Sequence, residues 1–388
     1  MPTILLVSAS FGSGHDVAAR RLGDRLAALG FATRQVDLLE LMPLHIGRAL
    51  RQAYRVQLGT VPNTWNVLSD WMERRTGKCA ATWIGSLATR RLRELICPDT
   101  VAAVSTYPMA SQLLGRLRAA GSLPVPVVTL LTDMSVHRLW VADGVDAHIA
   151  LDDVAGDAAD RLGAANVSVC SPIVPPIFRP AEPGEQAEAR RKFGLPRSET
   201  LALVVTGSWG VGAFRQTATD LAATGLAVPV VACGGNERGR SRLAARGVGV
   251  PLGWVDDMAA LFHACDIVIQ SGGGCSVHEA LACGRPVLTY RCLPGHGRGN
   301  AARLDEAGWA PWVRHRAELR NAVATALRTP VFVPATPLDA ARVVADLVAS
   351  TSASAAAQAW VATASDLAST PATLPGARSD RPRPLVST

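Results

Sequence analysis

Short apolar runs alternate with helix-like stretches along most of the chain, and this alternation limits the folds that it can adopt. The strand-like runs are 4–7, 36–38, 101–106, 127–132 and 148–151 in the first half, and 201–206, 228–233, 248–252, 267–269 and 287–290 in the second. Strands that alternate with helices are typical of parallel, doubly wound sheets. We therefore predict an α/β chain with two Rossmann-like domains that face a cleft.

A proline-rich segment separates the two halves. Residues 171–185 read SPIVPPIFRPAEPGE, and their five prolines stiffen a linker and exclude a central strand. We predict a first domain over 1–172, a linker over 173–185 and a second domain over 186–350. Residues 351–388 are rich in Ala, Ser, Thr and Pro, so we expect a disordered, low-complexity tail there.

The bulk composition fits a globular protein. The chain has 388 residues, of which 48% are hydrophobic and 18% are charged. It has no run of about 20 apolar residues and no charged start with a cleavage site, so we expect neither a membrane-spanning helix nor a signal peptide. The eight cysteines form no CxxC pair, which favours reduced thiols in the cytoplasm and disfavours a zinc site.

Positive charge is concentrated in one segment. Residues 45–118 carry eleven basic and four acidic side chains, an excess that equals the net charge of +7 of the whole chain. Basic helices with interleaved tryptophan suit an anionic membrane surface, which we expect to meet residues 48–93. A solvated basic face is the alternative, and no recognition motif supports nucleic acid as a partner. The aromatic residues of 48–93 are Tyr54, Trp65, Trp71 and Trp83.

The first strand-like run leads into the turn SASFGSGHD and then into a helix. An apolar stripe at i, i+4 and i+7 predicts this helix over 15–29. Gly12 and Gly14 allow a tight turn, and the bare N–H groups of the helix start then face whatever lies above the strand ends. Anions bind at such a helix start, and His15 would lie beside them. An ordinary glycine turn is the alternative.

A second glycine-rich loop offers a more specific signal. Strand 267–269 runs into Ser-Gly-Gly-Gly, and a helix follows that carries Glu279 in its first two turns. N–H donors ahead of a helix cradle a diphosphate, and a carboxylate at this place can bind two hydroxyls of a ribose. Glycines that serve packing alone are the alternative. The residues predicted for the diphosphate are Gly272, Gly273, Gly274, Cys275 and Ser276.

Residues 253–300 resemble the donor half of GT-B glycosyltransferases, and the most similar group is glycosyltransferase family 28. That family includes monogalactosyldiacylglycerol synthases, bacterial diacylglycerol glucosyltransferases and the peptidoglycan N-acetylglucosaminyltransferase that acts on lipid I. The glycolipid synthases fit best. The matching segments follow in order over residues 3–315: GSGH, TDMSVHRLW, VPPIFRP, VTGSWGVGAF, ACGGN and PGHGRGN.

The resemblance implies a GT-B fold and an inverting, metal-independent transferase that uses a UDP-sugar and no cofactor. It implies that the first domain binds the acceptor and the second binds the donor. Trp254 and Val255 are then expected to offer backbone groups to the uracil. Ser208 should assist at the phosphates. The resemblance also places His296 and Asn300 at the hydroxyls of the sugar.

Two groups are candidates for the base that takes the proton of the acceptor. Imidazole titrates near neutral pH, so His15 suits general-base work, or else it positions the acceptor. Strand 127–132 ends at Asp133, which also points into the cleft, and His137 would orient it. Asp133 as a simple helix N-cap is the alternative. The sequence leaves this choice open.

The acceptor is less specified than the donor. The glycolipid synthases imply a lipid acceptor, with diacylglycerol as first choice, at the inner face of the cell membrane. A soluble hydrophobic aglycone is the runner-up acceptor. A UDP-sugar 2-epimerase or a non-catalytic nucleotide-sugar binder would also carry two such glycine loops. Three residues depart from the family pattern: Trp209 replaces a small residue, Arg298 a lysine and His296 a glutamine, which leaves the donor sugar open.

Overall fold

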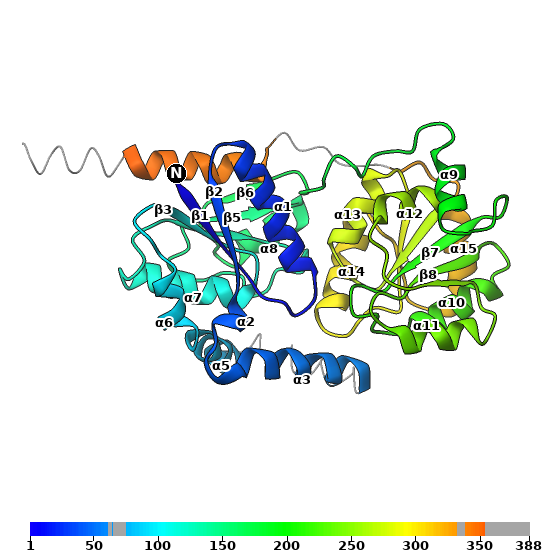
Figure 1. Ribbon diagram of the computed structural model, residues 1–388, viewed down its shortest axis with the longest axis horizontal. Coiled ribbons are helices and arrows are strands. Elements are labelled where there is room, and N and C mark those ends of the chain that lie inside the picture. The colour runs from blue at the N-terminus through cyan, green and yellow to red at the C-terminus, as the bar shows by residue number, and fades with distance from the viewer. Residues whose placement is uncertain (61–63, 65–74, 332–337, 354–388) are drawn as a thin grey trace, which may run out of the picture.

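Two parallel sheets of six strands each build the protein in the computed structural model, which describes residues 1–60, 64, 75–331 and 338–353. The first sheet has the order β2-β1-β3-β4-β5-β6, and the second has the order β12-β11-β10-β7-β8-β9. All the paired strands run parallel. Figure 1 shows the two sheets in separate lobes, each with its own helices. The predicted fold class is confirmed.

The strands and helices have the following bounds. The strands are β1 Thr3–Ser8, β2 Ala32–Asp37, β3 Thr100–Ser105, β4 Val127–Leu130, β5 Ala147–Ala150, β6 Val167–Val169, β7 Leu201–Val205, β8 Val228–Ala232, β9 Val250–Leu252, β10 Ile267–Gln270, β11 Val287–Tyr290 and β12 Trp312–Val313. The helices are α1 Gly14–Ala28, α2 Leu38–Leu41, the 3-10 turn η1 Pro43–His45, α3 Ile46–Thr60, α5 Arg75–Ser86, α6 Thr89–Glu94, α7 Pro108–Ala119, α8 Asp153–Arg161, α9 Glu185–Lys192, α10 Phe214–Ala223, α11 Glu237–Ala244, α12 Met258–Ala264, α13 Cys275–Ala282, α14 His296–Glu306 and α15 Arg316–Ala326.

The central strands of each sheet are buried on both faces, which matches their largely apolar sequences, whereas the edge strand β2 is exposed at residues 33–35. On β1, Ile4 and Leu6 pack with α1 in one core, whereas Leu5 and Val7 pack with α7 in another. The second sheet likewise separates a core with α12 and α13 from a core with α10 and α15. Successive side chains of a strand point to opposite faces, so helices on both sides bury both sets of side chains in these central strands.

Three strand predictions need correction. The strand expected at 36–38 is β2, which ends at Asp37 because the carboxylate of Asp37 accepts a hydrogen bond from the Leu39 N–H and caps α2. Strands β6 and β12 were not expected from the sequence. They have three and two residues, which is too short for a period to be recognised.

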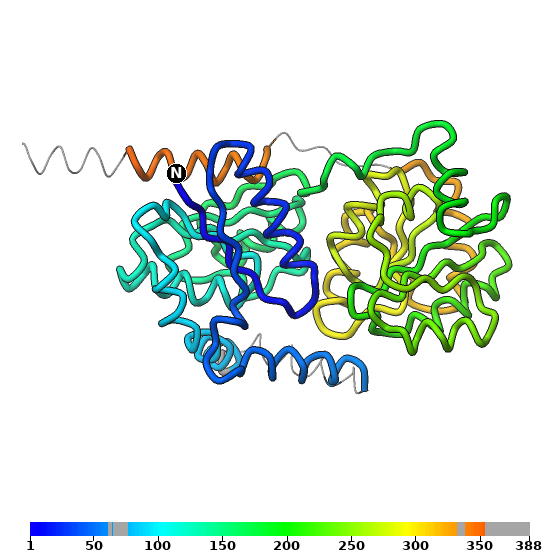
Figure 2. Tube along the Cα trace, in the orientation of Figure 1, coloured from blue at the N-terminus to red at the C-terminus, as the bar shows by residue number. Residues whose placement is uncertain are grey.

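The chain returns to the first domain at its described C-terminal end. Residues 340–353 are helical, and Ala340, Ala341, Val344 and Val348 belong to the same core as Ile4 and Leu22. Figures 1 and 2 show this orange segment beside the N-terminus. The second domain was predicted to extend to residue 350. This boundary is wrong, because the apolar side chains of the helix at 340–353 pack in the core of the first domain. The predicted tail lies outside the described residues, except for 351–353, which are helical.

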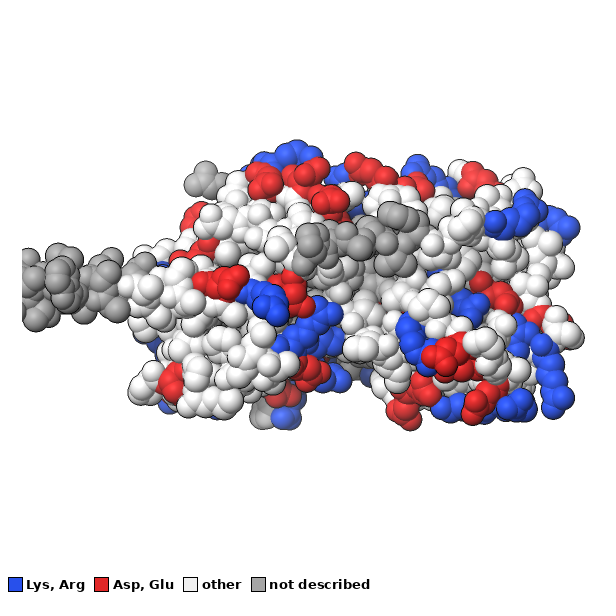
Figure 3. All heavy atoms as spheres, turned by 90° about the horizontal axis from the view of Figure 1, so that it is seen from above, with Lys and Arg blue, Asp and Glu red and all other residues white. Residues whose placement is uncertain are grey.

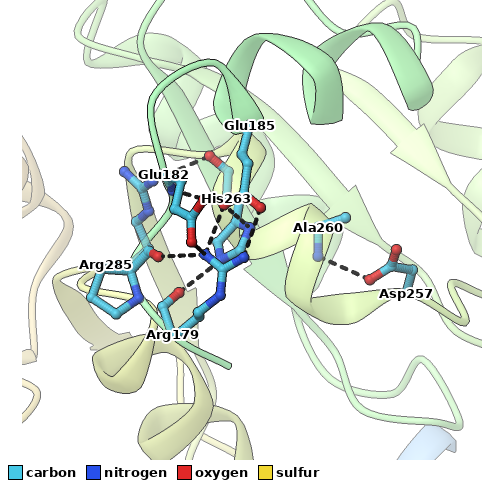
Figure 4. Close-up of polar contacts among 8 residues, drawn as sticks. Arg179, Glu182, Glu185, Asp257, Ala260, His263 and Arg285 are labelled. Atoms are coloured by element: carbon cyan, nitrogen blue, oxygen red, sulfur yellow. Dashed lines mark hydrogen bonds and ion pairs between the residues drawn. The ribbon is translucent and has the colours of Figure 1, made fainter. Parts of the chain in front are cut away.

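The proline-rich linker is held to both domains. The Ser171 N–H donates to the Leu338 carbonyl on the side of the first domain. Toward the second domain, Arg179 forms a two-armed ion pair with Glu185 at 2.8 and 2.9 Å, and His263 Nε2 lies 2.7 Å from the Arg179 carbonyl oxygen (Figure 4). These contacts fix the course of the linker between β6 and α9.

Candidate active site

Loops after three parallel strands bring predicted residues of both domains together. The turn after β1 carries Gly12 and leads to His15 in the first turn of α1. The loop after β4 carries Asp133, and the loop after β10 leads to Cys275. The two glycine turns touch, because Cys275 Sγ donates a hydrogen bond to the Gly14 carbonyl at 3.7 Å. Gly12 has a φ of +132°, a conformation that other residues rarely adopt.

Two cavities meet at this place. The larger has a volume of approximately 1140 Å³ and is lined mainly by apolar side chains, including Leu50 of α3, Ile84 of α5 and Met109 of α7. The smaller, of approximately 360 Å³, lies between the two glycine turns. We call them the acceptor cavity and the donor cavity after the roles proposed below. Both are lined by Phe11, His15, Tyr54, Asp133 and His296.

The hydrogen bonds of His15 define which ring nitrogen faces the cavities. Its Nδ1 lies 2.9 Å from the Thr106 carbonyl oxygen and 2.8 Å from Thr132 Oγ1. A carbonyl oxygen only accepts, so Nδ1 carries the proton and Nε2 is the acceptor of the neutral ring. Nε2 has no hydrogen-bond partner in the part of the chain that the structure describes. The ring of Tyr107 packs edge-on at 4.8 Å and holds the imidazole in place.

Asp133 lies in a cluster with three histidines. Burial by itself raises the pKa of Asp133, but His15, His296, a hydrogen bond from Asn300 and His137 together hold the pKa below its usual value. Asp133 is therefore a carboxylate at neutral pH. Burial lowers the pKa of His137 to about 4, with Asp133 opposing, so His137 is neutral there. His137 Nδ1 accepts from the Leu139 N–H at 3.3 Å.

Two of the five residues predicted for the diphosphate use their N–H groups within the loop itself. The N–H groups of Gly272 and Gly273 donate to the side-chain oxygen of Gln270, the second at 2.8 Å. Among the described residues, the N–H groups of Gly274, Cys275 and Ser276 have no partner, since they open α13. The donors that face the donor cavity are thus 274–276, and Gln270 shapes the loop that precedes them.

Glu279 pairs with the opposite domain. Its carboxylate forms an ion pair with Arg21 of α1, and both side chains are largely buried. Burial raises the pKa of Glu279, and Arg21 opposes this shift. Arg21 also lies 5.5 Å from the ring centroid of Phe178. Glu279 still lines the donor cavity, so the predicted ribose contact requires Arg21 to share or release the carboxylate.

Asn300 lines the donor cavity, and its side chain is also bonded to protein groups of both domains. Its Nδ2 donates to Asp133 Oδ1 at 3.2 Å and to the Gly272 carbonyl at 3.0 Å, while its Oδ1 accepts from the N–H and hydroxyl of Ser135 at 2.9 Å. The amide is 1% exposed. Asn300 therefore joins the two domains, and a contact to the sugar stays a prediction.

The remaining predicted donor residues lie where the sequence placed them. Ser208, Trp254 and Val255 line the donor cavity together with the glycine turns. Trp209, the residue that departs from the family pattern, lies 6.0 Å from the ring of Tyr54 and 5.9 Å from the guanidinium of Arg55. Both partners belong to α3, so Trp209 connects the donor loop to the helix that borders the acceptor cavity.

Comparisons with known proteins agree on the class. No family model matches the chain. A processive diacylglycerol beta-glucosyltransferase of Bacillus subtilis (strain 168) is 24% identical over 337 residues, which cover 84% of this chain and 86% of that protein. Anabaena Alr3699/HepE, solved in complex with UDP-glucose, superposes with a TM-score of 0.52 at 15% identity, covering 84% of this chain and 90% of that one. MurG of Acinetobacter baumannii gives 0.50 at 15% identity, with 85% and 91% covered.

The relatives, the fold and the series of sequence motifs each cover most of the chain, and all three indicate the same class of enzyme. The chain is a glycosyltransferase of the GT-B fold. Its sequence is similar to family 28, as the motifs predicted. No helix in the described residues is long and apolar enough to cross a membrane. The described residues also contain no group of three or more His, Cys, Asp or Glu side chains placed to hold a metal ion.

Several residues of the glycosyltransferase's site were not expected from the sequence. Arg21 contacts Glu279 and Tyr107 contacts His15, yet no motif marks Arg21 or Tyr107, because these partners are distant in the chain. Phe11 stacks on Tyr107 at 5.5 Å. In the sequence, Tyr54 is only one of the aromatic residues of the basic segment. Its burial on α3, edge-on to Phe11 at 5.4 Å, makes it part of the wall that both cavities share.

His278 makes the stability of the glycosyltransferase depend on pH. Its Nε2 is buried without a hydrogen-bond partner among the described residues, and burial, with the nearby charge of Arg21, lowers its pKa from 6.5 to about 4. As the pH falls between these values, the unfolded chain binds a proton that the folded chain does not, so the free energy of unfolding falls. We predict that His278→Leu loses less thermal stability between pH 7 and pH 5 than the wild type does. Equal losses in both proteins, measured by calorimetry, would contradict the assignment.

Proposed function

We propose that the enzyme transfers a hexose from a UDP-sugar to the hydroxyl of a lipid acceptor, with inversion at the anomeric carbon and diacylglycerol as the first acceptor to test. The observation that carries the proposal is the meeting of an apolar cavity and an amide-lined cavity at His15 and Asp133. The name of the Bacillus subtilis relative and the UDP-glucose bound to the Anabaena protein support these substrates.

In the donor cavity, the start of α13 meets the diphosphate. The free N–H groups of Gly274, Cys275 and Ser276 and the helix dipole stabilise the negative charge that develops on the leaving UDP. Glu279 binds the ribose after exchange with Arg21, and Trp254 and Val255 lie where a uracil would reach the backbone. No step of this scheme calls for a metal.

At the junction of the cavities, His15 acts as the general base. Its Nε2 takes the proton of the acceptor hydroxyl while the acceptor oxygen attacks the anomeric carbon on the face opposite to UDP. The Nδ1–H group continues to donate its hydrogen bond to the Thr106 carbonyl oxygen, and this bond holds the resulting imidazolium in one orientation. The carboxylate of Asp133 interacts electrostatically with His15 and stabilises that positive charge.

The acceptor cavity opens beside helices suited to a membrane surface. Arg48, Arg55 and Val56 of α3 and Trp83 of α5 are exposed, and Trp83 is 66% exposed. These helices lie on the lower side of Figure 1, whereas the face seen from above has interspersed acidic and basic side chains (Figure 3). We propose that residues 48–93 rest on the anionic inner face of the cell membrane. Trp65 and Trp71, also expected to contribute, lie outside the described residues.

An acceptor screen tests the proposed reaction. Purified full-length enzyme is incubated with labelled UDP-glucose, UDP-galactose or UDP-N-acetylglucosamine and with diacylglycerol in vesicles, lipid extracts or soluble aglycones. A labelled glycolipid supports the proposal. If only the soluble aglycones become labelled, the acceptor is a soluble aglycone and not a lipid. Free UDP together with an epimerised sugar would indicate a UDP-sugar 2-epimerase. Nucleotide binding without any turnover would indicate a non-catalytic protein that binds nucleotide sugars.

The membrane contact has its own prediction. Replacing Trp83 with serine should weaken binding to anionic vesicles by several fold, because an exposed indole at an interface supplies much of the apolar contact. Vesicle flotation at low salt measures this. Leu338→Ser is the control, since Leu338 is also exposed, at 48%, but belongs to the segment 338–353, which lies away from α3 and α5. Equal flotation of both variants would argue against the placement of this surface.

A further inference from the structure

A separate polar cavity of approximately 530 Å³ lies in the second domain, at the ends of β11 and β12. No acidic side chain lines it, and it holds four arginines. Arg298 lines the acceptor cavity as well, so the two spaces adjoin at the start of α14. We call this cavity the arginine pocket: its arginines are Arg291, Arg298, Arg314 and Arg316.

One buried carboxylate fixes two of the guanidinium groups. Asp220, which is 2% exposed, accepts from Arg291 Nε at 2.9 Å and Nη2 at 2.7 Å, and Arg316 Nε lies 3.2 Å away. The Tyr290 hydroxyl donates to the same carboxylate at 2.9 Å. These bonds use one edge of each guanidinium, and the N–H groups of the other edge remain for a ligand.

A stacked ring orients a third arginine. The guanidinium of Arg314 lies 4.4 Å from the ring centroid of Trp312, and its Nη2 is 3.5 Å from Asp305. Arg298 forms no ion pair within the described ranges of the chain. Side chains held by packing and by buried partners lose little conformational entropy when they bind a ligand.

The charges of the pocket are not balanced. Three of the four guanidinium groups pair with two carboxylates, those of Asp220 and Asp305. Arg298 pairs with no carboxylate in the described residues, so the four arginines exceed the carboxylates that pair with their side chains by two charges. Positive charge gathered in a concave site attracts anions, and guanidinium forks match the oxygens of phosphate. The side chains of Arg314 and Arg316 are 56% and 65% exposed, so a ligand can reach them from solvent.

We propose that the arginine pocket binds a phosphate group of a ligand other than the sugar donor, beside the acceptor cavity. The phosphate is that of an anionic phospholipid headgroup or of a soluble phosphate ester, which share the chemistry that the pocket recognises. The site is separate from the α13 cradle, since none of the four arginines lines the donor cavity. The inference does not depend on the transfer reaction.

Binding measurements with a matched pair of variants test the site. The pocket variant is Arg314→Gln with Arg316→Gln, and the control is Arg246→Gln with Arg328→Gln, two exposed arginines of the same domain without ion pairs in the described residues. Both variants lose two positive charges. The soluble probe is glycerol phosphate, titrated by calorimetry with UDP present to occupy the donor cavity. We expect the pocket variant to bind it about tenfold or more weakly, and the control within about twofold of wild type.

A vesicle arm separates the two sources of phosphate. Flotation compares phosphatidylcholine vesicles with and without phosphatidylglycerol. If the pocket variant binds more weakly than the control only to phosphatidylglycerol vesicles, the pocket binds a lipid headgroup. If it binds more weakly than the control only to glycerol phosphate, the pocket binds a soluble phosphate ester. The proposal is overturned if both variants bind both probes alike, a result that is independent of any failure to transfer sugar. Thermal unfolding of both variants checks that they are folded.

Discussion

Replacing His15 with alanine should lower kcat/KM by about a hundredfold to ten-thousandfold, the range that a general base contributes. The loss should fall on kcat, because His15 lines both cavities and, in the proposed mechanism, its Nε2 contacts the reacting hydroxyl rather than UDP. The dissociation constant of UDP should stay within about twofold. Steady-state kinetics with the acceptor found in the screen, together with calorimetry for UDP, measure the two quantities.

The matched variant for this experiment is Asp133→Asn. It keeps the shape of the side chain but removes the charge that interacts with His15 and His296. If Asp133 only stabilises the imidazolium, replacing its carboxylate should lower kcat/KM less than replacing His15 does. A His15→Ala enzyme with near wild-type turnover, or an Asp133→Asn enzyme with the larger loss, would transfer the role of base to Asp133.

The parts of the site that could be predicted from the sequence are local. In the two turns, β1 to α1 and β10 to α13, the strand, the glycines and the helix start are adjacent in the chain, so the pattern itself carries the geometry. The same holds for Asp133, which follows β4 directly. The roles of these residues remain predictions, although their positions around two joined cavities agree with them.

The parts that could not be predicted arise from contacts between distant segments. Arg21 and Glu279 are 258 positions apart, and Asn300 meets Ser135 across 165 positions. Nothing local shows that Asn300 is engaged by protein groups or that Gln270 occupies the first two glycine N–H groups. The helix at 340–353 has an ordinary apolar stripe, and a stripe does not say which domain it covers.

Gly272 is where local backbone geometry and a long-range contact coincide. It has a φ of +112°, and a Cβ there would lie 2.6 Å from Gly297 Cα and still closer to the Gly297 carbonyl oxygen. Its N–H donates to Gln270, and its carbonyl accepts from Asn300, the residue that joins the domains. The position of the α13 start thus depends on a residue without a side chain, since the backbone of Gly297 leaves no room for one.

We therefore expect Gly272→Ala to weaken UDP binding by about tenfold to a hundredfold, which corresponds to the roughly 1–3 kcal/mol that a strained backbone residue costs. The clash with Gly297 displaces the loop, and the N–H groups of Gly274, Cys275 and Ser276 move with it. Gly247→Ala is the control, because Gly247 also has a positive φ, +62°, but no atom lies within 4 Å of its added Cβ. Backbone strain alone then lowers the melting temperature in both variants, whereas only the first loses UDP affinity. Unchanged UDP binding in a folded Gly272→Ala protein would mean that the α13 start does not hold the nucleotide.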